Sequence, residues 1–197
     1  MAVNGGEFVT KAHLKLADFA ARLAADAARK RPPVARWNPD FEGEIDIRIR
    51  ADGTWTYLGS PIRRPEMVKL FASILRRDDD GRTCLVTPVE KLAIQVDVAP
   101  FVAVEMFVEG EGRSREISFR TQVDDYVRLD SDHPLRVETR PPRDEPRPFV
   151  LVRDRLEALI ARSVFYDLVD LAEERPGPAD TELGVWSAGT YFPIGTV

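Results

Sequence analysis

The stretch that decides the fold of this chain is Ile45-Asp46-Ile47-Arg48-Ile49-Arg50-Ala51-Asp52-Gly53-Thr54-Trp55-Thr56-Tyr57-Leu58. Isoleucines alternate with polar residues in its first half, which is the pattern of a β-strand with one buried face. Asp52-Gly53 is typical of a tight turn, and a second strand is expected to follow it. The sequence therefore predicts a β-hairpin here.

The length of the hairpin loop decides which side chains share a face. With a two-residue loop, Arg50 is expected opposite Trp55, and Arg48 opposite Tyr57. The isoleucines then lie on the other face. The sequence thus predicts one sheet face that carries two arginines and two aromatic rings.

A helix is expected soon after this hairpin. Gly59-Ser60-Pro61 interrupts the strand, and Pro65 suits the first turn of a helix. The expected helix has an apolar stripe at helical spacing, made by Met67, Leu70, Phe71, Ile74 and Leu75. Asp78-Asp79-Asp80-Gly81 should end the helix, and a further hairpin is expected over residues 82–87 and 92–98.

The second half of the chain is expected to consist of strands around one more helix. Short strands are predicted over 101–109, 114–121, 124–129, 135–139 and 149–152, with a loop over 140–148. Asp154-x-x-Glu157 matches a capping box, so a helix is expected from there to about Glu174. A last hairpin is expected over 183–188 and 190–196.

These elements predict an α+β protein with mainly antiparallel sheets, since strands and crossover helices do not alternate regularly. A first helix is expected over residues 11–29. Residues 45–98 and 135–197 both read as hairpin, helix, hairpin, which indicates an internal duplication. We expect an N-terminal domain over residues 1–98 and a C-terminal domain over residues 99–197.

Composition limits the classes of function. The net charge of −5 over 197 residues argues against a general binder of nucleic-acid polymers. A single cysteine, Cys84, allows no internal disulfide, which fits a reducing compartment. No signal peptide or apolar membrane span is recognised, so a cytoplasmic protein without membrane insertion is expected.

No catalytic or metal-binding signature stands out. His13 and His133 are the only histidines, and with Cys84 they are too few for a zinc site. The chain has no G-x-S-x-G nucleophile motif. We therefore expect no metal, no cofactor and no assignable catalytic residue.

One candidate binding site remains. Arg63 and Arg64 immediately precede Pro65, where a helix begins, and a helix N-terminus with arginines suits an anion. Trp55 and Tyr57 are expected on the neighbouring arginine face, where they could stack on a planar ring. A nucleotide-like ligand would suit both features. The alternative is that these arginines are solvated over half-buried aromatics.

Longer motifs of the chain resemble a bacterial family, domain of unknown function 1285. The similar runs are Trp37-Asn38-Pro39, Gly43-Glu44-Ile45-Asp46-Ile47, residues 52–62 with Arg64, residues 85–91, Ala99-Pro100-Phe101, residues 159–169 and Gly184-Val185-Trp186-Ser187-x-Gly189. The resemblance covers nearly the whole chain after the first helix.

The resemblance implies a duplicated two-domain α+β fold whose C-terminal half is similar to pleckstrin-homology folds. It also implies a site between the domains for a nucleotide-based ligand, and a role in bacterial signalling. It brings no established enzymatic activity and no catalytic residues. The two halves are not perfect copies, since Arg64 precedes its helix whereas Arg162 is expected inside one.

The leading hypothesis is a protein that binds a small anionic, nucleotide-like ligand in the interdomain cleft. The expected contacts are Arg64, Trp55 and Arg63, followed by Trp37, Tyr57, Thr87 and Glu90. One alternative is a hydrolase or transferase of a phosphorylated metabolite, with Glu90 or Asp124 as general base. Another is a module that contacts a protein partner through its C-terminal half and the loop over residues 140–148.

Overall fold

The structure is a computed structural model, and it describes residues 32–141, 145–177 and 180–196. The helix expected over residues 11–29 lies outside the described residues. The chain divides into two compact units. The first contains the described residues up to Asp46 together with Ile62–Ile94, and the second contains Ile47–Pro61 and the described residues from Gln95 onwards.

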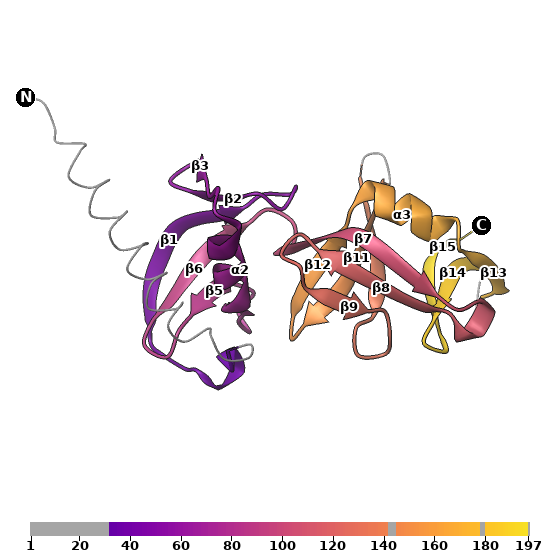
Figure 1. Cartoon of the computed structure of the whole chain (residues 1–197), viewed down its shortest axis with the longest axis horizontal. Coiled ribbons are helices and arrows are strands. Elements are labelled where there is room, and N and C mark those ends of the chain that lie inside the picture. The colour runs from indigo at the N-terminus through magenta and orange to yellow at the C-terminus, as the bar shows by residue number, and fades with distance from the viewer. Residues whose placement is uncertain (1–31, 142–144, 178–179, 197) are drawn as a thin grey trace, which may run out of the picture. The chain divides into compact units, whose positions relative to one another are not determined.

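The N-terminal sheet has six strands in the order β3-β2-β1-β6-β5-β4. A short 3-10 helix, η1 (Val34–Arg36), precedes it, and the helix α2 (Pro65–Ser73) lies against one face of the sheet (Figure 1). The strands are β1 (Phe41–Ile49), β2 (Trp55–Tyr57), β3 (Ser60–Pro61), β4 (Leu75–Arg77), β5 (Thr83–Val86) and β6 (Lys91–Val96).

The predicted hairpin is present, but its predicted register is wrong by one residue. Trp55 pairs with Ile49, and Tyr57 pairs with Ile47. The loop is longer than predicted: the N–H of Arg50 donates to the carbonyl of Thr54 (2.9 Å), and Gly53 takes a positive φ of 84°. Such three-residue loops need a residue in the left-handed region, which glycine adopts readily.

The shift of one residue moves both aromatic rings to the other face of the sheet. Trp55 is 2% exposed and Tyr57 is 7% exposed, and both share the buried face with Ile47 and Ile49. The expected face of arginines and aromatics does not form. Arg48 is instead exposed, and its Nε donates to Asp97 Oδ1 at 2.6 Å.

Helix α2 begins at Pro65, as predicted, and ends earlier than predicted. It stops at Ser73, and Leu75 is the first residue of β4 rather than part of the helical stripe. β4 pairs with β5 around a turn in which Gly81 has a φ of 84°. The pairing of Leu75 with Leu85 buries both side chains, which explains why the chain leaves the helix there.

The side chain of Asp78 links β4 to β6. Its carboxylate accepts hydrogen bonds from Arg76 Nε (2.6 Å) and Lys91 Nζ (3.1 Å), while Arg76 Nη1 donates to the Trp37 carbonyl at 2.6 Å. Burial pushes the pKa of Asp78 up, but the bonds from Arg76 and Lys91 outweigh that effect and lower its pKa. Asp78 therefore stays ionised and holds two cations in place.

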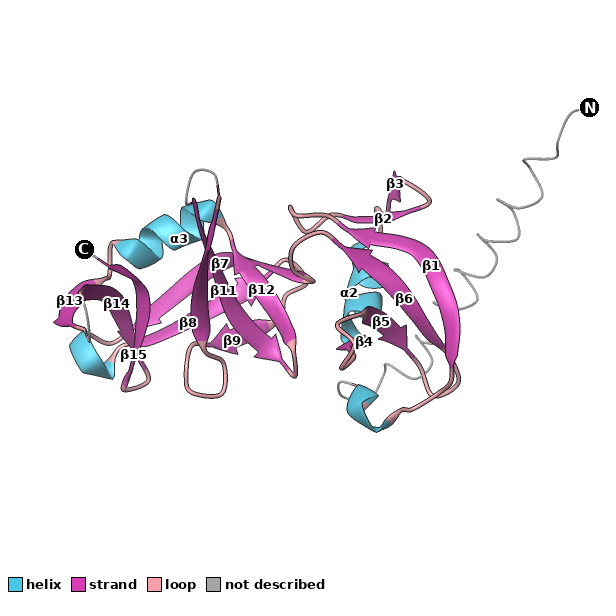
Figure 2. Ribbon diagram, turned by 180° about the vertical axis from the view of Figure 1, so that it is seen from behind, coloured by secondary structure: helices cyan, strands magenta, loops and turns pink. Residues whose placement is uncertain are grey.

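The C-terminal sheet also has six strands, in the order β10-β11-β12-β7-β8-β9. Its strands are β7 (Phe101–Glu109), β8 (Glu116–Thr121), β9 (Tyr126–Arg128), β10 (Leu135–Arg140), β11 (Glu145–Arg153) and β12 (Leu156–Ile160). The helices are η2 (Gly112–Ser114) and α3 (Arg162–Val169). A third sheet contains β13 (Glu173–Pro176), β14 (Thr181–Ser187) and β15 (Thr190–Thr196) beside the end of α3 (Figure 2).

The helix predicted from Asp154 to Glu174 is wrong at both ends. Asp154 is a turn residue with a φ of 47°, and residues 156–160 form β12. Leu156, Ala158 and Ile160 are buried in strict alternation, which is the pattern of a strand. Only Arg162–Val169 is helical, and residues 173–176 belong to a strand. Pairing on both sides of β12 thus outweighs the local capping signal.

The predicted α+β class is confirmed, and most of the strand pairs are antiparallel. β12 runs parallel to β7 with Leu159 beside Val102. β6 ends beside the end of β1, where the N–H of Asp97 donates to the Ile49 carbonyl at 3.0 Å. The strands expected over 101–109 and 114–121 pair as a hairpin. The hairpin expected over 183–188 and 190–196 is also present, and its first strand begins at Thr181. Residues 145–148, expected in a loop, begin β11. The internal duplication stays a prediction.

Ser187 connects the third sheet to the C-terminal sheet. Its hydroxyl is fully buried, donates to the carbonyl of Leu129 (2.6 Å) and accepts from the N–H of Ile117 (2.9 Å). The next residue continues the contact, since the N–H of Ala188 donates to the Arg115 carbonyl at 2.9 Å. One side chain thus satisfies two buried backbone groups.

Replacing Ser187 with Ala should lower the free energy of unfolding by about 2–4 kcal/mol, because two buried backbone groups lose their partner. Urea unfolding followed by circular dichroism measures this. Ser114→Ala is the control, since the exposed Ser114 hydroxyl donates to Glu111 within one turn; its effect should be about 0.5 kcal/mol or less. Equal losses in the two variants would contradict the bridging role of Ser187.

Replacing Asp78 with Asn should destabilise the protein by about 1–3 kcal/mol at neutral pH, because two charged donors lose their ionised acceptor. The pKa of Asp78 is lowered on folding, so its contribution is complete above the unfolded value of 3.8 and is lost as the pH falls through the folded pKa. The stability gap between wild type and D78N should therefore close in acid. Urea titrations at a series of pH values test this. The exposed Asp80 provides the control, Asp80→Asn, for which a smaller gap is expected.

Candidate functional site

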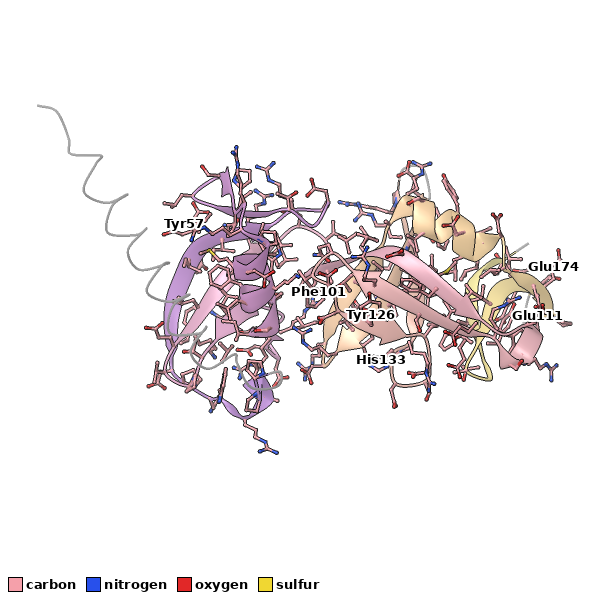
Figure 3. The ribbon with its side chains drawn as sticks, viewed as in Figure 1. Tyr57, Phe101, Glu111, Tyr126, His133 and Glu174 are labelled. Carbon is pink, nitrogen blue, oxygen red and sulfur yellow. The ribbon has the colours of Figure 1, made fainter. Side chains whose placement is uncertain are left out.

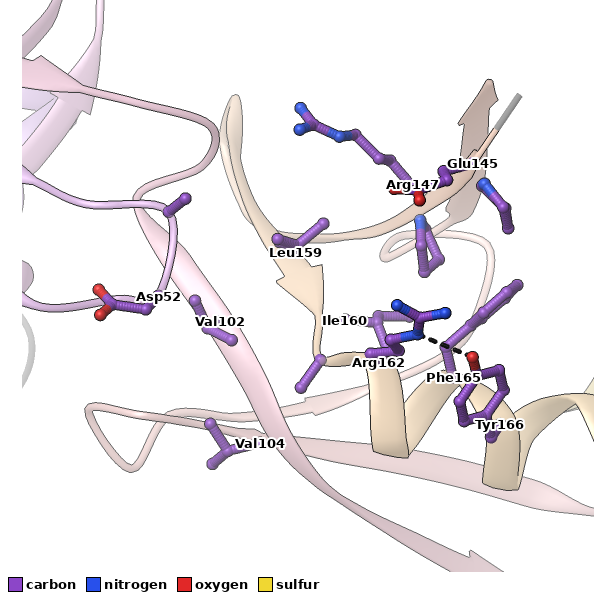
Figure 4. Close-up of a pocket in the computed structure, with 14 residues that line it drawn as sticks. Asp52, Val102, Val104, Glu145, Arg147, Leu159, Ile160, Arg162, Phe165 and Tyr166 are labelled. Carbon is purple, nitrogen blue, oxygen red and sulfur yellow. Dashed lines mark hydrogen bonds between the residues drawn. The ribbon is translucent and has the colours of Figure 1, made fainter. Parts of the chain in front are cut away.

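A pocket of about 480 Å³ lies in the second unit, where β12 passes into α3 (Figure 4). Pockets of this size accommodate small molecules. Its walls come from the β1–β2 turn, β7, the start of β11, the end of β12 and the first turns of α3. The lining residues are Ala51, Asp52, Val102, Val104, Glu145, Pro146, Arg147, Pro148, Leu159, Ile160, Ala161, Arg162, Phe165 and Tyr166.

The parallel pairing of β12 with β7 creates the pocket. The ladder ends with the N–H of Ala161 donating to the Ala103 carbonyl at 2.9 Å, and the chain turns into α3 at once. The first bond of the helix runs from the N–H of Phe165 to the Ala161 carbonyl at 2.8 Å. The first N–H groups of any helix have no intrahelical partner. In α3 no side chain caps them either. Ligands commonly bind where a parallel strand meets the start of a helix.

The first residues of β11 extend past the end of β12 and form a second wall. Leu159 of β12 pairs with Phe149, and β12 ends one residue later, so residues 145–147 of β11 have no strand beside them on that side. Arg147 is half-buried on this overhang, and its side chain reaches away from β11 in Figure 4. Glu145 lies on the same face of the strand two residues earlier.

Arg162 provides a second cation from the opposite wall. Its Nε donates to the Tyr166 hydroxyl at 2.7 Å, across one turn of α3 (Figure 4). This hydrogen bond, together with nearby Glu145, raises the pKa of Arg162. Tyr166 thus orients the Arg162 guanidinium, and several of its N–H donors stay directed to solvent.

The remaining wall is largely apolar. Val102, Leu159 and Phe165 form much of this surface, and Val104 is 40% exposed. Asp52 lies at the edge and already accepts a hydrogen bond from the Thr54 N–H at 2.9 Å, which lowers its pKa. The arrangement combines two guanidinium groups and free helix N–H groups with apolar area, which suits an anion attached to an apolar or planar group.

None of the seven residues predicted from the sequence lines this pocket. Arg63 and Arg64 are exposed at the start of α2, and Arg64 is the helix N-cap. Trp55 and Tyr57 point into the core of the N-terminal sheet. Their burial removes the stacking surface on which the sequence hypothesis depended.

The other three predicted residues have structural contacts. Thr87 and Glu90 close the β5–β6 turn: the N–H of Glu90 donates to Thr87 Oγ1 at 2.9 Å, and the N–H of Thr87 donates to the Glu90 carbonyl at 2.8 Å. Trp37 is half-buried behind η1, where its carbonyl accepts from Arg76. The structure therefore brings Thr87 and Glu90 together, but their contacts stabilise a turn.

Sequence reasoning missed Arg147 and Arg162. Arg147 lies between two prolines in a stretch expected to be a solvated loop, and Arg162 was expected in the middle of a long helix. The available signal was the alternation of Leu156, Ala158 and Ile160, which ends immediately before Ala161-Arg162. A strand end followed by a short helix would have directed attention to this arginine.

The described residues were also compared with the other kinds of site considered from the sequence. Within those residues, no three His, Cys, Asp or Glu side chains are grouped as metal ligands, and no helix is both long and apolar enough to cross a membrane. Asp124 is engaged as an acceptor for Arg120 Nη1 at 2.8 Å. His133 lies in the expected turn, with its Nδ1 3.0 Å from Asp130 Oδ1 (Figure 3).

Comparison with known proteins identifies a family whose description gives its function as unknown. Residues 32–99 match the N-terminal domain and residues 100–194 match the C-terminal domain of a family described as of unknown function, DUF1285. No curated protein matches the chain.

Two solved structures are similar to this one. A DUF1285 family protein from Silicibacter pomeroyi DSS-3 is 49% identical, with a TM-score of 0.80 over 89% of this chain and 95% of that chain. A DUF1285 family protein from Shewanella baltica OS155 is 27% identical, with a TM-score of 0.50 over 63% of this chain and 90% of that chain.

Cys84 should resist thiol reagents in the folded protein. Burial, followed by the charge of Asp78, raises the pKa of its thiol, so little thiolate forms near neutral pH. Labelling by a chromogenic disulfide reagent should be slow without denaturant and complete in urea. The control introduces Ser60→Cys, at an exposed position, into a Cys84→Ala background. Immediate labelling of the native wild-type protein would contradict the burial.

Proposed function

We propose, for a chain that belongs to the family DUF1285, that its function is to bind a small anionic ligand in the pocket between β11, β12 and α3. The ligand class is the one expected from the sequence, but the proposed binding site lies elsewhere in the chain. The binding residues are Arg147 and Arg162, in place of Arg63 and Arg64.

The observation that carries this proposal is the placement of two arginines at one pocket beside an uncapped helix N-terminus. Guanidinium groups bind phosphate and carboxylate with paired N–H donors. The N-terminal end of a helix adds a partial positive charge and free N–H groups. Since Tyr166 holds Arg162 in position, less side-chain entropy is lost when an anion binds there.

The apolar wall favours a ligand that carries an apolar or planar group in addition to its anion. Val102, Val104 and Phe165 offer apolar surface, which an inorganic phosphate would leave uncovered. A nucleotide, or another ring attached to a phosphate, would contact both walls. We therefore propose a nucleotide-like ligand.

A role in signalling forms part of this proposal. Ligand binding transmits a signal only if the ligand has different affinities for two states of the protein. Because α3 lies between the pocket and β14, this helix is our candidate for the element that responds. The pleckstrin-homology-like form of the C-terminal half stays a prediction, and we infer no lipid ligand from it, because fold does not settle function.

The first experiment is a thermal-shift screen with nucleotides, cyclic dinucleotides, sugar phosphates and dicarboxylates, followed by calorimetric titration of each compound that raises the melting temperature. A ligand that binds only the folded state raises the melting temperature in a dose-dependent way. Each binding compound is then incubated with the protein and examined for turnover, which would indicate an enzyme. Absence of any shift across the panel would overturn the proposal.

Arg147→Ala and Arg162→Ala should each weaken binding by about 10- to 150-fold, since each removes a charge-assisted hydrogen bond worth ~1.5–3 kcal/mol. Calorimetric titration measures the change. Arg64→Ala is the matched control, because Arg64, like Arg162, is an exposed arginine at a helix start, and it does not line the pocket. Loss of binding in R64A, with R147A and R162A unchanged, would return the site to the start of α2.

A further inference from the structure

The prolines of β11 leave the strand edge at the pocket with carbonyl acceptors but few N–H donors. The N–H of Leu151 donates to the Pro134 carbonyl at 3.1 Å, so the backbone groups of Leu151 face β10. N–H and C=O groups alternate in direction along an antiparallel strand. The backbone groups of residues 146, 148 and 150 therefore face the opposite side, towards β12 and the pocket.

Two of these three residues are prolines, which have no N–H. The register of Phe149 with Leu159 places Ile160 opposite Pro148. In this position the Ile160 N–H can donate to the Pro148 carbonyl. Pro148 has no N–H that could donate to the Ile160 carbonyl. The Ile160 carbonyl thus receives no hydrogen bond from β11, although Ile160 is only 2% exposed.

Pro146 extends the same edge beyond the end of β12. Its carbonyl faces the side on which β12 has already stopped, and its nitrogen offers no donor. Pro146, Pro148 and Ile160 all line the pocket. This edge therefore presents carbonyl acceptors and lacks N–H donors, while the facing start of α3 presents N–H donors.

We propose that the pocket selects ligands that carry an N–H donor, such as an amino or amide group, close to their anionic group. The donor binds the carbonyls of Ile160 and Pro146, and the anion binds Arg162 and Arg147. This inference rests on the proposed function and adds a selectivity to it. A buried carbonyl without a partner is unfavourable, so a ligand donor that reaches it gains more than a donor at an exposed site.

The test compares ligand pairs that share an anion and differ by one donor. The pairs are aminoethyl phosphate with ethyl phosphate, and aspartate with succinate. In at least one pair, the amino compound should bind about 10-fold or more tightly in calorimetric titration. Binding of both members with equal affinity would overturn the selectivity while leaving the proposed function intact. Absence of binding by every compound would overturn both.

Pro148→Ala tests the cause of the selectivity. Alanine restores the N–H, which should donate to the Ile160 carbonyl and reduce the preference for the amino compound to about 3-fold or less. Slow exchange of the amide proton gained at position 148 should accompany this change and would report the bond without any ligand. Pro193→Ala is the control, because Pro193 is an exposed strand proline that does not line the pocket. An unchanged preference in P148A, with the new amide protected from exchange, would overturn the assignment of the Ile160 carbonyl.

Discussion

The parallel pairing of β12 with β7 is the constraint on which the C-terminal half depends. It places Leu159 beside Val102 and ends where the Ala161 N–H meets the Ala103 carbonyl. Every other strand pair in the described C-terminal sheet is antiparallel. Because β12 stops at this point, β11 extends past it, α3 begins beside it, and the pocket forms between the two.

Backbone hydrogen bonding links the architecture to the chemistry of the pocket. At the junction with the third sheet, the Ser187 hydroxyl provides a partner for two buried backbone groups, the Ile117 N–H and the Leu129 carbonyl. At the end of β12 the prolines of β11 remove the donor that the Ile160 carbonyl would otherwise meet. The pocket therefore combines incomplete backbone pairing with two arginines, and both features favour a polar ligand with an apolar part.

Sequence patterns predicted the elements whose signals are local. Pro65 predicted the start of α2, and the strand patterns of residues 101–109 and 114–121 predicted β7 and β8. Local sequence patterns gave the wrong secondary structure where pairing with another strand decides it. The capping box at Asp154 predicted a helix, but pairing with β7 and β11 made residues 156–160 a strand. The Asp52-Gly53 turn was recognised, yet its loop is longer than predicted, and the error moved Trp55 to the buried face.

The sequence by itself determined the family, the α+β class and an anionic ligand as the working hypothesis, because motifs, periodicity and charge are properties of neighbouring residues. Only the tertiary structure decided which arginines line one pocket. Arg147 and Arg162 are brought to one pocket by a strand order that joins segments far apart in the chain, and no local spacing encodes that order. Which backbone carbonyl lacks a donor likewise depends on register, which is set by packing of the whole sheet.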